Sequence, residues 1–364
     1  MPSKDISLLF VRADYSVRQV MECIDRNRLG IALVVDEQTK LLGTITDGDL
    51  RRAVLSSVSI EASVVHLLGH KTSSAPRKPV AASCEAPREI LIQLMRDEAV
   101  RHVPLLNDLQ QVVGMVTFDE LVPEENVMMQ AVIMAGGFGS RLRPLTEDMP
   151  KPMLLLGDKP LLERTIAQLQ QAGIRRVSIT THFRPEKITE YFGDGKSFGV
   201  ELNYVNEQSP LGTAGALGLM KLNGDPLLVI NGDILTDVDF RAMSAYHREH
   251  RADMTVAVRA YEVQVPYGVV ECDGSRVTRL EEKPKLQFFV NAGIYMLEPH
   301  VHASIPHEKH FDMTELIQSL IERNGTVVSF PVREYWLDIG QHSDYKRAIE
   351  DHKAGRMTNQ KSGS

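Results

Sequence analysis

The sequence predicts an α/β protein in which a mainly parallel, helix-covered sheet follows a smaller α+β module. Three observations predict this fold: strand-like apolar runs alternate with helical patterns after residue 129, a gapless internal repeat fills the first part, and a glycine-rich loop follows the first strand-like run of the second part. With 364 residues, the chain has room for two or three domains. The predicted boundaries are a repeat pair at 1–125, with copies at about 6–57 and 65–122, a larger domain at 129–353 and a flexible polar tail at 354–364.

Composition and charge exclude several classes of protein. Hydrophobic residues make up 43% and charged residues 24%, the usual balance of a globular protein. The net charge of −7 provides no basic field for a nucleic acid, so we expect no nucleic acid partner. Any phosphate recognition must therefore be local.

Cysteine spacing and the N-terminus favour a soluble, cytoplasmic protein. Cys23, Cys84 and Cys272 are odd in number and far apart, which indicates neither a disulfide framework nor a zinc pair. The opening "MPSKDISLLF" has an acidic residue where a signal peptide carries its apolar segment. No apolar run approaches the roughly 18 residues of a membrane span, so we expect no membrane partner.

The first part of the chain contains the repeat. "LVVDEQTKLLGTITDGDL" (Leu33 to Leu50) aligns without gaps on "PLLNDLQQVVGMVTFDEL" (Pro104 to Leu121), and Thr46 matches Thr117 at an offset of 71 residues. In each copy a helical pattern, "SVRQVMECIDRN" or "PREILIQLMRDE", precedes two short apolar strands joined by a polar turn and then a second helix start. The two copies predict a pseudo-symmetric pair.

The repeat resembles a tandem pair of cystathionine-β-synthase-type (CBS) domains, whose paired cleft often binds an adenine nucleotide. "GTITDGD" places Thr46 and Asp49 where that family contacts ribose and phosphate. The second copy departs from the pattern, since "GMVTFDE" follows Thr117 with Glu120 where an Asp is expected. A longer carboxylate can still accept ribose hydroxyls. The resemblance therefore implies either an adenine nucleotide site or an assembly role, and it favours a homo-oligomer.

The second part of the chain has the rhythm of a parallel sheet covered by helices. "VPEENVM" (Val122 to Met128) breaks the repeat pattern with a proline and two acids. The helical pattern "PLLERTIAQLQQAG" is expected to have Asp158 as its cap, Pro160 in its first turn and Gly173 at its end. The later helix "FDMTELIQSLIERNG" has Asp312 and Glu315 at capping-box spacing.

A glycine-rich loop follows the first strand-like run, in "AVIMAGGFGSRLRPLT". Ligands of an open parallel sheet bind beyond the carboxyl ends of its strands, which is where this loop is placed. The loop glycines let backbone N–H groups approach phosphate oxygens, and Arg141 and Arg143 add cationic forks. A dinucleotide fingerprint and a Walker loop are both excluded by the residues that follow. The loop thus favours a nucleoside triphosphate, with a structural turn as the alternative.

The longer string "GGFGSRLRPLTEDMPKPML" closely resembles the signature of the sugar-1-phosphate nucleotidyltransferases, and the resemblance extends through Asp351. It implies a Rossmann-like, GT-A-like nucleotidyltransferase sheet. It also implies a reaction in which a sugar-1-phosphate oxygen attacks the α-phosphorus of a nucleoside triphosphate and releases pyrophosphate. The nucleotide-binding positions that it implies are Ala135, Gly136, Gly137, Gly139, Ser140, Pro210, Gly212, Thr213 and Asp233.

The same resemblance assigns the catalytic and metal residues. Arg141 would stabilise the β- and γ-phosphates, and Lys151 of "MPKPM" would contact the α-phosphate and the attacking phosphate. Phosphoryl transfer depends on such cations and on a metal. Asp233, after the buried run "LLVIN", and Asp338 of "WLDIG" match the positions that hold Mg²⁺. The alternative for each aspartate is that it only stabilises a turn.

Three further motifs are assigned to the sugar phosphate. In "LEEKP", Glu282 would hold sugar hydroxyls and Lys283 the sugar phosphate. "PYGVVE" would place Gly268 against the sugar, and "FVNAGIY" would place Asn291 and Gly293 there. A solvated charge cluster is the alternative for "LEEKP".

Two features of the sequence, the segment Ser209 to Leu217 and the CBS pair before the larger domain, suggest the base and the sugar. Base choice is expected to lie in Gly137 and "SPLGTAGAL" (Ser209 to Leu217). The Pro-Leu-Gly-Thr-Ala-Gly of this segment resembles the guanylyltransferases that act on mannose-1-phosphate-like sugars, which implies GTP. A CBS pair joined to this domain resembles bacterial enzymes that activate glucosamine-1-phosphate or related sugars for surface glycans. Two alternatives stay open: a uridylyl- or thymidylyltransferase acting on a glucose-type phosphate, and a nucleotide-sensing scaffold with an inactive transferase domain.

Overall fold

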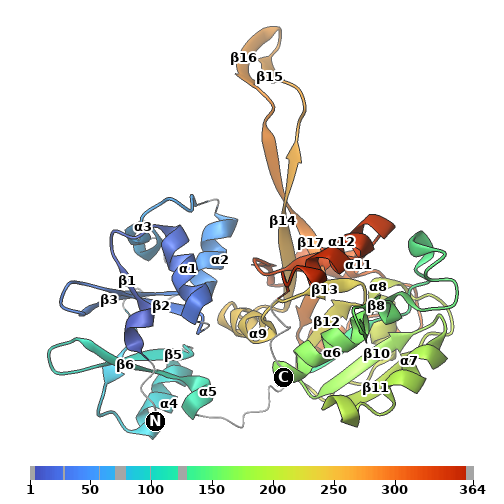
Figure 1. Cartoon of the computed structure of the whole chain (residues 1–364), viewed down its shortest axis with the longest axis horizontal. Helices are drawn as coiled ribbons and strands as arrows, with labels where there is room; N and C mark the ends of the chain where they lie inside the picture. The colour runs from blue at the N-terminus through green and yellow to red at the C-terminus, as the bar shows by residue number, and fades with distance from the viewer. Residues whose placement is uncertain are drawn as a thin grey trace. The chain divides into compact units, whose positions relative to one another are not determined.

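The computed structural model divides the chain into two compact units (Figure 1). One unit comprises Met1–Asn126 with Arg241–Arg251, and the other comprises Val127–Phe240 with Ala252–Ser364. The residues that the structure describes are 5–27, 29–56, 58–69, 79–98, 100–121 and 129–357. The predicted break at Val122–Met128 and residues 358–364 of the predicted tail lie outside them.

The first unit holds two copies of one small motif. In each copy a short strand pairs in parallel with a second strand, which pairs antiparallel with a third. The first copy consists of β1 (Phe10–Arg12), α1 (Val17–Asn27), β2 (Ile31–Val35), β3 (Leu41–Thr46), α2 (Asp47–Leu55) and α3 (Val64–Gly69), after the 3₁₀ turn η1 (Ile6–Leu9). The second copy consists of β4 (Ala82–Ser83), α4 (Arg88–Asp97), β5 (His102–Leu106), β6 (Val112–Thr117) and α5 (Phe118–Leu121).

Apolar spacing explains how each copy packs. Val17, Val20 and Ile24 recur at helical spacing on α1 and are buried in one cluster with residues of β2, a strand that is buried along its whole length. The predicted helix, strand pair and helix start are present in both copies. Strands β1 and β4 are additional, because runs of two or three residues are too short to show a period.

The second unit is built on a seven-stranded sheet of order β11-β10-β7-β12-β17-β14-β18. Four neighbouring strands pair in parallel, β17 runs antiparallel to both of its neighbours, and β18 is parallel to β14. The sheet is therefore mixed and mostly parallel, which confirms the predicted fold class. Its strands are β7 (Gln130–Met134), β10 (Arg176–Thr181), β11 (Glu201–Asn206), β12 (Leu227–Asn231), β14 (Met254–Gln264), β17 (Lys285–Leu297) and β18 (Val327–Pro331).

Short ladders and helices complete this part of the chain. The two-stranded ladders are β8 (Leu155–Leu156) with β9 (Lys159–Pro160), β13 (Ile234–Thr236) with β19 (Trp336–Asp338), and β15 (Val269–Asp273) with β16 (Arg276–Glu281). The α-helices are α6 (Leu161–Gln171), α7 (Pro185–Phe192), α8 (Gly212–Gly215), α10 (Pro299–His302), α11 (Met313–Glu322) and α12 (His342–Lys353). Helix α9 (Phe240–Glu249) follows in the chain between β13 and β14, but all of it except Phe240 belongs to the first unit. The 3₁₀ turns are η2 (Ser140–Leu142), η3 (Lys151–Met153), η4 (Lys196–Phe198) and η5 (Ala216–Leu219). Among the described residues, no helix has both the length and the apolar composition to cross a membrane.

The start of α6 differs from the prediction. Pro160 stands at its N-cap position, and no side chain caps the helix. The assignment of Asp158 as the cap was wrong, because Lys159 and Pro160 first pair with Leu155 and Leu156 and this ladder delays the helix. Gly173 follows the helix with a φ of +85°, as expected of the residue that ends it.

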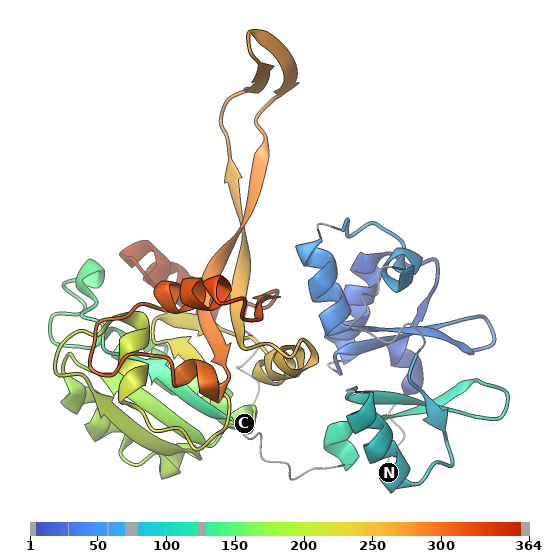
Figure 2. The same cartoon turned by 180° about the vertical axis from the view of Figure 1, so that it is seen from behind.

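Strands β14 and β17 continue well beyond the sheet as a two-stranded ribbon, with β15 and β16 at its far end (Figures 1 and 2). We call residues 259–290 the arm. The ladder is irregular between Val256 and Val258, just before the arm begins. Val256 and Val258 are buried in the sheet, whereas nearly all of the arm is exposed.

Candidate active site

The site forms at the carboxyl ends of β7, β10 and β12, which are adjacent and parallel. The backbone N–H of Ala135, just after β7, donates to the carbonyl of Thr180 on β10 at 3.1 Å. The N–H of Gly232, just after β12, donates to the carbonyl of Met134 on β7 at 2.9 Å. These bonds hold the two strand-end loops side by side, in the place where an open sheet binds ligands.

Two glycines of the predicted phosphate loop are required by close packing. A side chain at Gly136 would clash with Oε1 of the buried Glu207. Gly139 has a φ of +60°, and a Cβ there would lie 3.2 Å from the Cβ of Lys151. The hydroxyl of Thr146 donates to the carbonyl of Gly139 at 2.7 Å and fixes the loop. Gly137, in contrast, has open space where a side chain would lie.

This difference gives a matched pair of variants. We expect Gly136→Ala to destabilise the protein by about 1–3 kcal/mol, because Glu207 is buried and cannot move aside without loss of packing. Thermal unfolding should show a lower Tm. Gly137→Ala is the control and should leave the Tm unchanged, since nothing lies within 4 Å of the added carbon. Equal Tm values for the two variants would contradict this account of the loop.

Lys151 is placed directly against Asp233. It begins the turn η3, is only 8% exposed, and its Nζ lies 2.7 Å from Oδ2 of Asp233. The two residues are 82 positions apart in the chain. The structure thus brings together a predicted catalytic cation and a predicted metal ligand.

Asp338 joins the same group through the β13–β19 ladder. Ile234 pairs with Asp338, and the N–H of Ile339 donates to the carbonyl of Asp233 at 3.0 Å. Burial, and then the charge of Asp233, raise the pKa of Asp338 above its usual value, whereas Lys151 and Arg141 lower it. Two carboxylates are therefore held close enough to repel each other, with cations nearby.

The residues present fit a hard divalent cation. Besides the two carboxylates, the side-chain oxygen of Asn231, the last residue of β12, is buried without a hydrogen-bond partner among the described residues. A buried polar oxygen of this kind indicates a partner that is absent from the protein itself. Carboxylate and amide oxygens are the ligands that Mg²⁺ accepts, and Mg²⁺ typically takes only one or two carboxylates from the protein.

Arg141 lies at the edge of this group. It is exposed on the turn η2 and has no ion-pair partner among the described residues. A Cβ added at Gly340 would lie 3.7 Å from Nη1 of Arg141 and 3.7 Å from Oδ1 of Asp338. The guanidinium and the carboxylate are therefore both next to Gly340. With Gln341, His342 and Ser343, Arg141 lines an open hollow. The guanidinium is thus placed to receive an anion from solvent.

The segment predicted to select the base is tied to the start of α11. The N–H and the hydroxyl of Thr213 both donate to Oδ1 of Asp312, at 2.9 and 3.1 Å. Gly212 has a φ of +79°, and a Cβ there would also meet this carboxylate. The predicted capping box is confirmed, since Glu315 accepts from the N–H of Asp312 at 2.7 Å. The binding roles of Gly212, Thr213 and the exposed Pro210 stay predictions.

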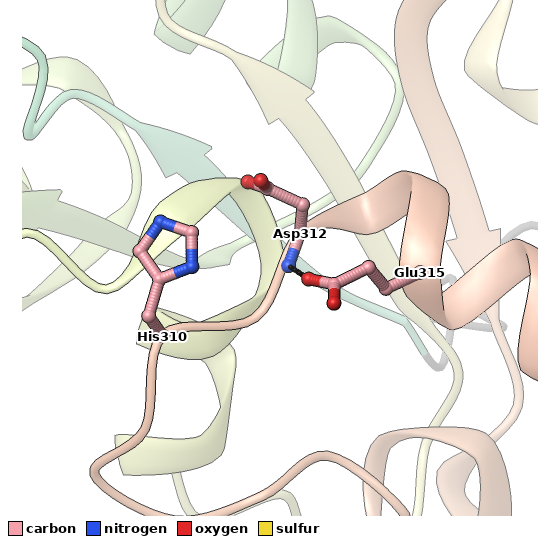
Figure 3. A group of neighbouring side chains, drawn as sticks. All are labelled: His310, Asp312 and Glu315. Atoms are coloured by element: carbon pink, nitrogen blue, oxygen red, sulfur yellow. Dashed lines mark hydrogen bonds between the residues drawn. The ribbon is translucent and has the colours of Figure 1, made fainter.

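His310, Asp312 and Glu315 are the one group of three potential metal-ligating side chains among the described residues whose ligand atoms lie within 4.8 Å of one another (Figure 3). Both carboxylates already accept backbone hydrogen bonds at the N-terminus of α11. These bonds explain why the carboxylates gather here, so we assign no metal to the group.

The predicted sugar-phosphate residues fall into two separate groups. Asn291 and Gly293 lie near the metal side of the site, because a Cβ on Gly293 would be 2.8 Å from the amide nitrogen of Asn231. Gly268, Glu282 and Lys283 gather in the distal part of the arm, where a Cβ on Gly268 would be 2.9 Å from Oε2 of Glu282. The structure does not bring the second group to Asp233 of the same chain.

Sequence reasoning missed three residues beside the glycine loop. Glu207 follows β11 and is buried, which raises its pKa, and its Oε2 accepts from the N–H of Leu211 at 3.1 Å. His182, after β10, has its Nδ1 2.8 Å from the carbonyl of Glu207 and its ring 5.2 Å from that of Phe138. Asn231 was the third. A polar residue at or just after the carboxyl end of a strand is the signal that marks all three.

The predicted CBS ligand residues cap two helices. Thr46 and Asp49 form a capping box at the start of α2, and Oδ1 of Asp49 also lies 2.7 Å from Arg52. In the second copy, Glu120 accepts from the N–H of Thr117 at 3.0 Å, and its own N–H donates to the Thr117 hydroxyl at 3.2 Å. The local structure is thus the same despite the longer carboxylate. Binding of a nucleotide by these residues stays a prediction.

The fold and the site together define an α/β domain with a glycine-rich loop, a buried cation and paired carboxylates at the strand ends. A family model for nucleotidyl transferases matches residues 130–355, and a CBS domain model matches residues 3–56 and 74–124. The chain belongs to the nucleotidyl transferase family and carries a CBS pair before that domain. The suspected family is therefore confirmed.

Relatives agree with this assignment. The chain is 35% identical over 227 residues to a probable mannose-1-phosphate guanylyltransferase of Oryza sativa, covering 60% of this chain and 63% of the relative. It is 33% identical over 230 residues to the mannose-1-phosphate guanylyltransferase of Mycobacterium tuberculosis, covering 61% and 64%. The chain thus spans less than two thirds of the length of either relative. A solved Bacillus anthracis structure, assigned as a glucose-1-phosphate thymidylyltransferase, matches with a TM-score of 0.52 and 25% identity, over 65% of this chain and 98% of that one.

Proposed function

We propose that this protein is a sugar-1-phosphate guanylyltransferase, which forms a GDP-sugar and pyrophosphate from GTP and a hexose- or hexosamine-1-phosphate. The observation that carries the proposal is the group of Lys151, Asp233 and Asp338 at the end of β12, next to the glycine loop. An oxygen of the sugar phosphate forms a bond to the α-phosphorus, the bond from the α-phosphorus to the bridging oxygen breaks, and pyrophosphate leaves with that oxygen. The reaction needs positioning and charge neutralisation more than covalent chemistry by the protein.

The residues of the site divide these tasks. The backbone of the loop from Ala135 to Ser140 binds the triphosphate, and Arg141 neutralises the charge that grows on the leaving pyrophosphate. Lys151 is held by Asp233 at the point where the α-phosphate and the attacking phosphate meet. Asp233 and Asp338, with Asn231, would hold Mg²⁺, which neutralises phosphate charge when bound.

The choice of GTP and the sugar follows from the relatives. Two relatives described as mannose-1-phosphate guanylyltransferases, at 35% and 33% identity, support guanine and a mannose-type phosphate. The glucosamine-type phosphate is proposed from the CBS pair that precedes the transferase domain. The Bacillus anthracis structure favours a second candidate, a thymidylyl- or uridylyltransferase acting on a glucose-type phosphate. We propose that the protein acts in the cytoplasm and that its nucleotide-sugar product supplies glycan synthesis.

Pyrophosphate release separates these candidates. The purified chain with Mg²⁺ is given GTP, UTP, dTTP, CTP or ATP, each crossed with mannose-1-phosphate, glucosamine-1-phosphate and glucose-1-phosphate. The proposal expects release with GTP and a mannose- or glucosamine-type phosphate. Release confined to dTTP or UTP with glucose-1-phosphate would favour the second candidate, and no release from any pair, with or without AMP, would favour an inactive scaffold.

We further propose that the CBS pair binds an adenine nucleotide through Thr46 and Asp49. Millimolar AMP should raise the Tm of the full-length protein, because a ligand at 100 times its Kd stabilises the folded state by about 2.7 kcal/mol. Thr46→Ala serves as the comparison: its baseline Tm should fall through loss of a helix cap, and its AMP shift should vanish. An AMP shift of equal size in both proteins would remove Thr46 from the nucleotide site. No shift in the wild type would leave the CBS pair with an assembly role.

A further inference from the structure

The arm carries an apolar face that no described residue covers. Residues paired across an antiparallel ladder point to the same face, so the pairs Tyr261 with Phe288 and Val263 with Leu286 place four apolar side chains together. Their exposed fractions are 55% for Tyr261, 41% for Val263, 45% for Leu286 and 52% for Phe288. A ribbon of two strands is at best marginally stable in water by itself, and contiguous exposed apolar surface marks an interaction site.

The opposite face of the same ribbon is polar beyond the pair Ala260 with Phe289, the pair nearest the sheet on that face. Gln287 donates to Oε1 of Glu262 at 3.2 Å, and Nζ of Lys285 lies 3.2 Å from Oε2 of the same carboxylate. Gln264, which pairs with Lys285, completes this face. Between residues 261 and 264 and their partners the two faces thus alternate, so one face is suited to water and the other to burial against a partner.

The end of the arm, where part of the predicted sugar-phosphate group lies, also exposes apolar side chains. Five large apolar side chains there are exposed, namely Tyr267, Val269, Val270, Val277 and Leu280. Glu282 and Lys283 are exposed beside them. The six residue steps of the ladder from Asn291 to Lys285 span about 20 Å. While the ladder is intact, the far end of the arm, where β16 leads into β17, therefore lies away from the sheet of its own chain (Figures 1 and 2). Lys283 belongs to this connection between β16 and β17.

We propose that the arm docks on a second copy of this chain, where its apolar face is buried and its Glu282 and Lys283 complete the sugar-phosphate side of the partner's site. The inference rests on the proposed function for the role of these two residues. Each chain keeps Asn291 and Gly293 near Asn231 but carries its own Glu282 and Lys283 away. If two identical chains exchange their arms, each site receives Glu282 and Lys283 from the other chain. Both chains then use the same apolar face of the arm, as the subunits of a closed two-fold dimer do.

Charge at the site supports the same partner. Lys151 is already paired with Asp233, and Arg141 is assigned to the leaving pyrophosphate, so a further cation would stabilise the phosphate of the sugar. The exposed Lys283 of a second copy supplies this cation.

Complementation between two inactive chains tests the exchange. One chain carries Asp233→Asn and an intact arm, and the other carries Lys283→Met and an intact metal side. The two are co-expressed with different affinity tags, and complexes that contain both chains are isolated over both tags. An exchanged pair then has one site with every group intact, so we expect about half of the wild-type activity, whereas each variant alone stays inactive.

The other outcomes overturn the proposal. If each chain uses its own arm, every site in the mixed complex has one defect and no activity returns. If Lys283→Met alone keeps its activity, the end of the arm is not part of the site. A wild-type protein that is inactive with every substrate pair would instead mean that the proposed function fails, and the location of the arm is then read by cross-linking.

Cross-linking locates the arm without any assay of activity. Cys272 lies exposed on β15, and in a Cys84→Ser protein a benzophenone maleimide placed on it reports what the end of the arm contacts. Isotope-labelled and unlabelled chains are refolded together or co-expressed, so that links between chains differ in mass from links within one chain. We expect links from Cys272 to residues 129–357 of another chain. Links only within one chain, or no links at all, would contradict the proposal.

Variants on the two faces of the ribbon provide a matched control. Tyr261→Asp with Phe288→Asp places charge on the apolar face and should reduce the links between chains on the order of tenfold or more. Glu262→Ser with Gln287→Ser alters the opposite face at paired positions of the same ladder and should leave the links unchanged. Equal yields from the two double variants would exclude the apolar face as the docking surface.

Discussion

Asp233→Asn is expected to lower the rate of pyrophosphate release on the order of a hundredfold or more, which is the usual cost of losing one electrostatic stabiliser at a transferring phosphate. Asparagine keeps the shape of the side chain but removes a charge that pairs with Lys151 and, by this proposal, helps to hold Mg²⁺. Initial rates over a range of Mg²⁺ concentrations provide the measurement, since loss of a metal ligand should also raise the Mg²⁺ concentration needed for half-maximal rate.

The matched control is Asp194→Asn. Asp194 is an exposed aspartate of the same unit that pairs only with the neighbouring Lys196 among the contacts described. Its replacement should leave the rate and the Mg²⁺ dependence unchanged. Near-normal turnover by Asp233→Asn, with the fold intact by circular dichroism, would remove Asp233 from the metal site.

Lys151→Met is the second change for which a large loss is expected, again on the order of a hundredfold or more. Methionine preserves much of the apolar stem of this nearly buried side chain but removes its cation. By the proposed mechanism, the α-phosphate and the attacking phosphate then lose their positive partner, and the charges of Asp233 and Asp338 are less well neutralised. The rate constant at saturating substrate should fall, because this charge matters most as the new bond forms.

Lys196→Met provides the comparison for Lys151. Lys196 is exposed and pairs with Asp194, so its loss should change neither the rate nor the Tm by much. A Lys151→Met protein that keeps its rate but binds substrate less tightly would contradict a transition-state role and leave Lys151 as a binding residue.

Local patterns in the sequence were sufficient to predict much of the fold. The strands β7 and β12 are largely buried apolar runs, and such runs are visible without any tertiary information. The box formed by Asp312 and Glu315 depends on residues three apart, so it too was predictable. The actual start of α6 was not predictable in this way, because the chain first folds back and pairs Lys159 and Pro160 with Leu155 and Leu156, and the prediction that Asp158 caps the helix was therefore wrong.

The site itself was only partly predictable. A family pattern identified Lys151 and Asp233, but their 2.7 Å separation depends on how two strand ends meet in space. Asn231 and Glu207 belong to none of the motifs identified in the sequence. Only the structure shows that Glu207 is buried and that the side-chain oxygen of Asn231 is buried without a hydrogen-bond partner among the described residues. The spacing of "LEEKP" and "FVNAGIY" gave no sign that the ladder between β14 and β17 would carry Lys283 away from Asn291.

One competition experiment tests the central claim most directly. The purified protein receives equimolar GTP, UTP, dTTP, CTP and ATP with Mg²⁺ and one sugar-1-phosphate at a time, and the nucleotide-sugars are identified by mass. This account predicts GDP-mannose or GDP-glucosamine, formed in equal amount to the pyrophosphate released. A UDP- or dTDP-sugar as the main product, or pyrophosphate without any nucleotide-sugar, would contradict it.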